Sequence, residues 1–392
     1  MIVMRYGQLS DAGILSLAFA VGNVLLMIGK FGGRTFQVTD VKRQFVFGEY
    51  LIQRICTVVL MMLSLCALLC IVHYPDVKRK VIITISIIYA VEALEDCLWG
   101  LLQSHNRLYV GGAMFSTRWM MILCAFCLVL IYTGDMAGAL VMGALTGGGV
   151  FLLWLVIIRR DIINALHTGN EHIQKGGKER FPDLFRQTWP LFLSGFCAIF
   201  INSIPKFAID RYMSNEVQAG YGFVSMPVFV IGLLNQFVYQ PTIVKLTDDY
   251  YNNKKTEFCR GVNRQMCIVV FIAVGCVAGA ALIGIPVLSA IYHTDLNVYR
   301  AELIVLQFAG GFLALTGYFT VLLTLMRQQK TVLTGYVVSV LISLVVLNVS
   351  VKKAGTMGAS VGYVIIMCAM FAFYYCRYRK YVSQFVSEGR SL

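Results

Sequence analysis

Three carboxylates stand close together in the middle of a long apolar stretch of this sequence. The stretch reads VIITISIIYAVEALEDCLWGLLQSHNR and carries Glu92, Glu95 and Asp96. An ionisable side chain at the centre of a membrane helix costs on the order of 3 kcal/mol on insertion scales, so three cost on the order of 9 kcal/mol. The apolar residues of such a helix gain roughly a few tenths of a kcal/mol each, which only about offsets that cost. The helix must therefore turn these carboxylates away from lipid.

Helical periodicity gathers the polar residues of this stretch on one side. At about 100° per residue they fall within about 80° of arc, with Glu95 about 60° to the side of Glu92. This polar stripe consists of Glu92, Asp96, Gly100, Gln103 and Arg107. One interpretation is the wall of a water-filled cavity that binds a proton, a cation or a polar head group. The other is a buried network of ion pairs that holds helices together, with Arg54 or Arg118 as partner.

A second apolar stretch, TWPLFLSGFCAIFINSIPKFAIDRYM, also carries polar side chains. Asn202 and Lys206 are four residues apart and share one helix face, and Pro205 between them removes a backbone donor and should kink the helix. Two interpretations stay open for Lys206. It either contacts a substrate or extends its ammonium to the lipid head groups.

The composition shows what kind of element must position these residues. The chain has 392 residues, 58% of them hydrophobic and 14% charged, with a mean hydropathy of +0.73. Many apolar runs reach the 17 to 25 residues, roughly, that a helix needs to cross a bilayer. The sequence predicts an all-α integral membrane protein. Its expected spans are 11–32, 50–73, 81–103, 118–134, 136–158, 188–209, 217–240, 264–291, 301–326, 331–350 and 356–376.

Several other functions are disfavoured. The net charge of +13 resides mostly in loops between apolar runs, so it does not indicate nucleic-acid binding. Cys124 and Cys127 form a CxxC inside an apolar run without a second pair, which favours packing over a metal site. The sequence has no HExxH and no phosphate-binding GxxxxGK[ST]. We therefore expect no enzyme, no catalytic residue, no metal and no cofactor, apart from a proton or sodium ion as coupling ion.

The basic residues give an expected orientation and domain organisation. With the C-terminus cytoplasmic, 24 of the 33 Lys and Arg residues lie on the inner side. The longest polar segment, 159–188, divides five spans from six. We expect an N-lobe at 1–158, a cytoplasmic linker at 159–188, a C-lobe at 189–376 and a cytoplasmic tail at 377–392. If each lobe had six spans, the N-lobe would lack its first helix, which would also explain an external N-terminus.

The order of several short motifs resembles a known family. It resembles the bacterial oligosaccharidyl-lipid flippases (Wzx-type) of the multidrug/oligosaccharidyl-lipid/polysaccharide (MOP, MATE-like) exporter superfamily. The motifs are Gly29–Arg34, Phe36–Val41, Phe47–Arg54, Glu92–Gln103 with Arg107, Asn202–Tyr212, Met226-Pro227, Gln240-Pro241, Tyr292–Tyr299 and Met326–Gln328. The resemblance covers nearly the whole chain. It implies two lobes of helices around a cavity that opens alternately to either side.

The resemblance also implies a substrate and a place in the cell. The substrate would be an undecaprenyl-pyrophosphate-linked oligosaccharide, turned to the outer leaflet of the bacterial cytoplasmic membrane for polysaccharide biosynthesis. Its partners would be membrane lipid, a polysaccharide polymerase and a chain-length regulator. A pyrophosphate needs cations. The expected substrate-contacting residues are Arg54, Gln103, Arg118, Asn202 and Lys206, and the expected ion-coupling carboxylates are Glu92, Glu95 and Asp96.

Two alternatives stay open at this point. The first is a cation-coupled multidrug antiporter of the same superfamily, in which Glu92 and Asp96 would bind the cation or proton. The second is a membrane-embedded glycan polymerase, which the short outer loops disfavour.

Overall fold

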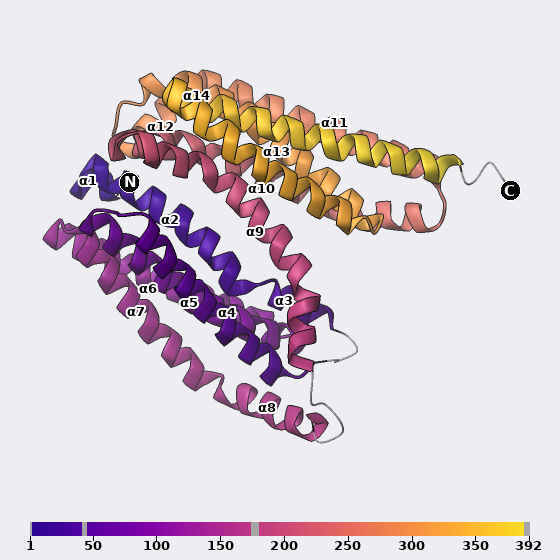
Figure 1. Ribbon diagram of the computed structural model, residues 1–392, viewed down its shortest axis with the longest axis horizontal. Coiled ribbons are helices and arrows are strands. Elements are labelled where there is room, and N and C mark those ends of the chain that lie inside the picture. The colour runs from indigo at the N-terminus through magenta and orange to yellow at the C-terminus, as the bar shows by residue number, and fades with distance from the viewer. Residues whose placement is uncertain (1, 41–44, 174–179, 388–392) are drawn as a thin grey trace. The chain divides into compact units, whose positions relative to one another are not determined.

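The computed structural model describes residues 2–40, 45–173 and 180–387, and these residues form helices joined by short loops (Figure 1). The first half contains α1 (Ile2–Tyr6), α2 (Leu9–Lys30), α3 (Gly33–Thr39), α4 (Phe47–Ile71), α5 (Asp76–Ser104), α6 (Leu108–Thr133), α7 (Met136–Ile157) and α8 (Arg159–Ile173). The second half contains α9 (Arg180–Tyr212), α10 (Asn215–Tyr251), α11 (Lys255–Gly279), a π-helical turn (Ala280–Gly284), α12 (Ile285–Tyr292), a 3₁₀ turn (Asn297–Tyr299), α13 (Arg300–Leu325) and α14 (Gln329–Ser387).

The chain forms two compact units, 2–203 and 204–392, whose boundary falls inside α9. The expected lobes and linker use different bounds and stay predictions. Within the expected linker, Arg159–Ile173 forms α8 and Arg180 begins α9, whereas residues 174–179, with Lys175 and Lys178, lie outside the described residues. The chain from 377 to 387, expected as a tail, continues α14.

In the first unit α5 is the central helix. It packs against α2, α3, α4, α6 and α7, and most of its residues are buried, including the carboxylates Glu92, Glu95 and Asp96. Close approach of α2 to α5 depends on Gly29, because a Cβ there would come within 2.9 Å of the Ala93 Cβ and the Met61 sulphur. The apolar residues around the end of α5, among them Leu98 and Leu102, join the core between α4 and α7.

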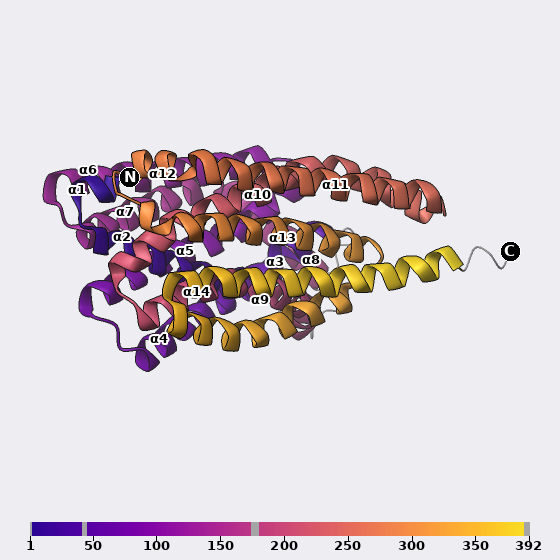
Figure 2. The same ribbon diagram turned by 90° about the horizontal axis from the view of Figure 1, so that it is seen from above.

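In the second unit α13 has the corresponding place, packed against α10, α11 and α14. α14 is not one straight helix, because Ala354 and Gly355 leave helical geometry and the chain folds back (Figure 2). The Tyr374 hydroxyl donates to the Val332 carbonyl at 2.8 Å and so joins the two antiparallel arms. These arms coincide with the expected spans 331–350 and 356–376.

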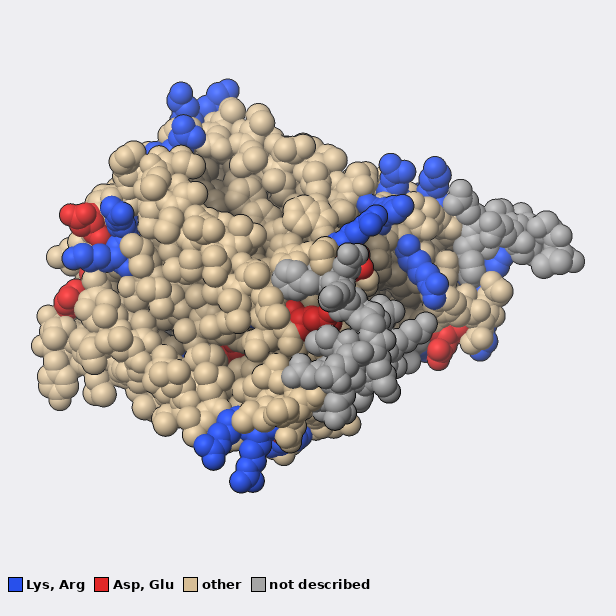
Figure 3. Space-filling view, turned by 60° about the horizontal axis from the view of Figure 1, so that its bottom comes forward, with Lys and Arg blue, Asp and Glu red and all other residues tan. Residues whose placement is uncertain are grey.

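The helices suit a membrane. Among the described residues, nine helical stretches are long and apolar enough to cross a bilayer. Helix α5 is outside this set because its carboxylates reduce its apolar character. Every expected span falls on helical segments, although the spans 11–32, 50–73, 118–134, 136–158 and 301–326 each run one or two residues past the last residue of the helix. The number of crossings stays a prediction. Figure 3 shows one face on which wide areas carry no charged residue and Lys and Arg stand in a few groups. The chain is an all-α, multi-pass membrane protein.

Candidate functional site

The candidate site begins where α2 ends. Lys30 is the last residue of α2, Phe31 and Gly32 both adopt left-handed backbone conformation, and α3 starts at Gly33. Gly32 is also the point where α9 comes close, since a Cβ there would lie 2.8 Å from the Leu191 Cβ. The turn places Lys30 and Arg34 on adjacent helices beside α5. These two cations, the three carboxylates of α5 and the two arginines that pair with them form a network that we call the charge cluster. Its members are Lys30, Arg34, Arg54, Glu92, Glu95, Asp96 and Arg118.

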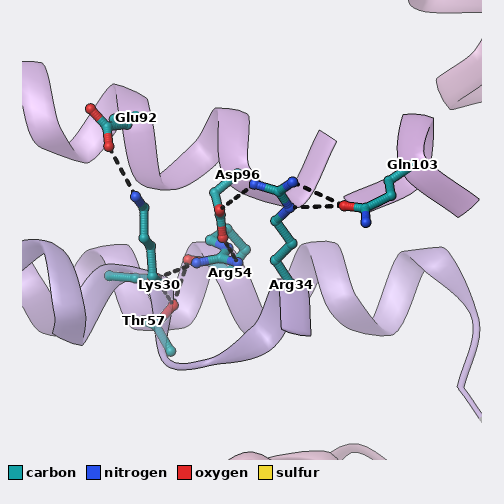
Figure 4. Close-up of polar contacts among 8 residues, drawn as sticks. Lys30, Arg34, Arg54, Thr57, Glu92, Asp96 and Gln103 are labelled. Atoms are coloured by element: carbon teal, nitrogen blue, oxygen red, sulfur yellow. Dashed lines mark hydrogen bonds and ion pairs between the residues drawn. The ribbon is translucent and has the colours of Figure 1, made fainter. Parts of the chain in front are cut away.

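Asp96 is the meeting point of two arginines (Figure 4). The Arg54 guanidinium lies 2.9 Å from one carboxylate oxygen and also donates to the Gly29 carbonyl at 2.8 Å. Arg34 lies 3.8 Å from the other oxygen and donates to the Gln103 side-chain oxygen at 2.9 Å. Arg54 is nearly fully buried, whereas 31% of the Arg34 side chain is exposed. Arg34 is therefore the one of the two that a ligand can reach.

Glu92 also meets two cations. Lys30 donates to one of its oxygens at 2.9 Å (Figure 4), and Arg118 lies 3.6 Å from the other. About a quarter of the Lys30 side chain, 24%, is exposed. Lys30 thus resembles Arg34 in having one side on the cluster and one side open.

Arg118 and Glu95 form the most deeply buried pair of the cluster. Their side chains are 1% and 0% exposed, and the guanidinium Nε donates to the carboxylate at 2.8 Å. The Glu95 Oε1 and the Arg118 Nη1 are buried without a hydrogen-bond partner among the described residues. The bare backbone of Gly147 on α7 permits this burial, because a Cβ there would come within 2.7 Å of Ile122, one turn along α6 from Arg118.

A cavity of about 540 Å³ lies beside the cluster within the first unit. It is lined by Met27, Lys30, Gly32, Arg34, Thr35, Val38, Thr39, Asp96, Gln103, Leu191, Phe192 and Gly195. Its charged lining residues are two cations and one carboxylate. The charge cluster as a whole has four cations for three carboxylates, so one positive charge is left in excess beside the cavity. Together with hydroxyl and amide groups, this suits an anionic ligand with polar substituents.

The structure brings most of the expected site residues together. In the first unit Arg54 pairs with Asp96, and Arg118 pairs with Glu92 and Glu95, so both arginines are the expected ion-pair partners. Gln103 accepts a hydrogen bond from Arg34. Asp96 and Gln103 line the cavity. Asn202 lies half-buried on α9, seven residues beyond the cavity-lining Gly195. Lys206 belongs to the second unit, where no ion pair of its ammonium occurs among the described residues.

Sequence reasoning did not select Lys30 and Arg34 as site residues. Both stand at the end of the first expected span, where basic residues commonly mark the membrane surface. A usable signal was their spacing of four residues around Phe31, Gly32 and Gly33. Lys30 ends α2 and Arg34 lies on α3, and both helices pack against α5, so both cations face the bundle as well as the cavity.

These observations define a polytopic helical membrane protein with a cation-rich cavity inside one helical unit. No protein-family model matches the chain. A curated relative, the capsular polysaccharide biosynthesis protein CapF of Staphylococcus aureus, is 19% identical over 383 residues, which span 97% of this chain and 94% of CapF.

Solved structures share the fold. The lipid II flippase MurJ in its inward closed conformation superimposes with a TM-score of 0.74 at 12% identity, covering 96% of this chain and 83% of MurJ. A multidrug resistance transporter of the MATE family, in the MOP superfamily and facing inward, gives a TM-score of 0.59 at 13% identity, covering 99% of this chain and 96% of that transporter. The chain therefore has the fold of MOP transporters. These solved relatives are transport proteins, not enzymes.

Proposed function

We propose that this protein is a flippase that moves an undecaprenyl-pyrophosphate-linked oligosaccharide across the bacterial cytoplasmic membrane for polysaccharide biosynthesis. The observation that carries the proposal is the cavity of the first unit, where Lys30 and Arg34 are partly exposed. A pyrophosphate is a compact, multiply charged anion that such a pair of cations binds through charge-assisted hydrogen bonds. Similarity to CapF supports polysaccharide biosynthesis, and the MurJ-like fold supports flipping of a lipid-linked precursor.

The buried members of the charge cluster have a different role in this proposal. Arg54 holds Asp96, and Arg118 holds Glu95 and Glu92, so these arginines position the carboxylates that orient Lys30 and Arg34. In the proposed cycle the cavity opens alternately to the two sides of the membrane, with the C-terminus cytoplasmic. A polysaccharide polymerase and a chain-length regulator would take over the product.

A coupling ion is also part of the proposal. A proton or sodium ion that binds Glu92 or Asp96 has to compete with Lys30, Arg34 and the buried arginines. Ion binding would therefore open an ion pair and free a cation for the pyrophosphate. Replacement of a cluster cation by the coupling ion would therefore couple ion binding to substrate binding at the same site.

The test uses the full chain in proteoliposomes with a fluorescent undecaprenyl-pyrophosphate oligosaccharide. We expect Lys30→Gln with Arg34→Gln to reduce the flipping rate at least about tenfold, because each charged hydrogen bond is worth roughly 1.5–3 kcal/mol. The exposed Arg159→Gln is the matched control and should leave the rate unchanged. Flipping at the wild-type rate by the double variant would remove these cations from the site.

Cells distinguish the flippase from its alternatives. A deletion strain should lose surface polysaccharide and accumulate lipid-linked units on the inner leaflet, with drug sensitivity unchanged. Altered drug sensitivity with normal surface polysaccharide would instead support the cation-coupled multidrug antiporter. Units that reach the outer leaflet but stay unpolymerised would support the glycan polymerase.

A further inference from the structure

A row of aromatic side chains follows one face of α9. Its members are spaced by three or four residues, which places them on the same side of a helix. The aromatic row consists of Phe185, Trp189, Phe192, Phe196 and Phe200. All five belong to the first unit, and each is half-buried or exposed, so the row is not part of the closed core.

The rings contact one another along the helix. Trp189 and Phe192 have centroids 5.4 Å apart, Phe192 and Phe196 are 5.6 Å apart, and Phe196 and Phe200 are stacked at 5.6 Å with an angle of 11° between their planes. Phe31 joins the first half of the row, since its ring lies 5.5 Å from Phe185, 6.0 Å from Trp189 and, stacked, 4.2 Å from Phe192. The row is therefore a nearly continuous aromatic surface about four helical turns long.

The middle of the aromatic row adjoins the cationic cavity. Phe192 lines that cavity together with its neighbours Leu191 and Gly195 on α9. Phe31, which stacks on Phe192, directly follows Lys30 in the chain. A ligand whose anionic group lies at Lys30 and Arg34 therefore meets a ring face immediately beside it.

The five rings of the row differ in burial from other side chains of α9. Cys197 and Ile201 are buried about 100° and 140° around the helix from the row. Thr188 is also buried, although it follows the spacing of the row between Phe185 and Phe192, and its hydroxyl accepts a hydrogen bond from Gln53 at 2.8 Å. The rings themselves stay half-buried or exposed, so a ligand in the neighbouring cavity can contact them.

We propose that the aromatic row binds the saccharide of the lipid-linked substrate, while Lys30 and Arg34 bind its pyrophosphate; the inference rests on the proposed function. The axial C–H bonds of a pyranose form a weakly positive face that complements the negative face of an aromatic ring. Its hydroxyls require hydrogen-bonding partners, and Thr35, Thr39 and Gln103 supply them in the same cavity.

The experiment compares two probes on the purified full chain by isothermal titration calorimetry. One probe is farnesyl pyrophosphate, and the other is the same molecule with a disaccharide attached to the pyrophosphate. We expect the wild-type protein to bind the disaccharide conjugate about tenfold more tightly. In Phe196→Leu with Phe200→Leu this ratio should fall to about one, while the affinity for farnesyl pyrophosphate stays the same.

Two further variants separate stacking from folding. Phe196→Trp with Phe200→Trp keeps the ring faces and should retain the tenfold ratio. Phe271→Leu removes a ring that is 79% exposed on α11 and should change neither affinity. If the affinity ratio of the two probes stays at tenfold in the double leucine variant, the aromatic row does not bind the saccharide, while the proposed flippase function is unaffected. A wild-type protein that binds neither probe would overturn both proposals.

Discussion

The central helices of the two units bury polar side chains in different ways. In the first unit the carboxylates of α5 meet Lys30, Arg34, Arg54 and Arg118. In the second unit α13 buries one carboxylate, Glu302, whose oxygen accepts a hydrogen bond from the Thr356 hydroxyl at 2.9 Å. No ion pair of Glu302 occurs among the described residues. The other buried polar groups of α13 are uncharged, for example Gln307 and Thr316.

This difference assigns separate tasks to the two units. A network of opposite charges inside a bundle is costly unless every member is paired, so it is retained where charge itself is needed. The first unit has such a network beside a cavity, whereas the second unit joins its helices through hydroxyls, aromatic rings and glycines. The comparison predicts that loss of charge is severe in the first unit and mild in the second.

Arg118→Ala should have the largest effect. It leaves Glu95 buried and without its cation, which costs about 3–5 kcal/mol for a buried pair broken on one side. Thermal unfolding in detergent and the yield of folded protein measure this loss. Arg118→Met combined with Glu95→Gln removes both charges and should recover most of the stability. If Arg118→Ala unfolds at the wild-type temperature, the pair does not stabilise the first unit.

Substitutions of the two glutamates test the comparison directly. Glu95→Gln should be strongly destabilising, because it leaves the buried Arg118 charge with only the Glu92 carboxylate, 3.6 Å away, as its partner. Glu302→Gln keeps an oxygen for the Thr356 hydroxyl and should be nearly neutral, while Glu302→Ala should cost about 1.5–3 kcal/mol. Unfolding curves of the three variants rank their losses of stability. If Glu95→Gln and Glu302→Gln lower the free energy of unfolding equally, buried charge is no more important in the first unit than in the second.

Glycines at helix contacts should matter in both units to a smaller extent. Gly29→Ala pushes a Cβ against Ala93 and Met61, and Gly335→Ala pushes one into the Tyr374 ring. We expect each to cost about 1–3 kcal/mol through overpacking. Gly148→Ala is the control, because no atom lies within 4 Å of its new Cβ. A stable Gly335→Ala would show that the arms of α14 separate easily.

The smallest effect is expected for an ion pair at the edge of the first unit. Arg107 and Asp161 lie 2.8 Å apart, but 43% of the arginine and 25% of the aspartate side chain are exposed. Water and salt screen such a pair. Asp161→Asn should leave the unfolding temperature unchanged within error. A clear drop in the unfolding temperature would show that an exposed ion pair stabilises the protein as much as the buried pairs of the charge cluster do.

Much of the fold was predictable because bilayer helices have a simple sequence signal. Continuous apolar runs located the helices, and the carboxylates of α5 marked the one span that had to be buried inside the bundle. The same reasoning identified Arg54 and Arg118 as partners, since a buried carboxylate needs a cation. It did not find α8 within the polar segment 159–188, because a short amphipathic helix has no long apolar run.

The sequence by itself determined that the chain is an all-helical membrane protein and that α5 carries charge into its interior. Only the tertiary structure decided that Lys30 and Arg34 return toward that charge, that Asp96 joins two arginines, and that an aromatic face of α9 adjoins the cavity. The reason is physical. Apolar length is a local property of the chain, whereas the ion pair between Lys30 on α2 and Glu92 on α5 joins residues 62 positions apart and depends on how the two helices pack.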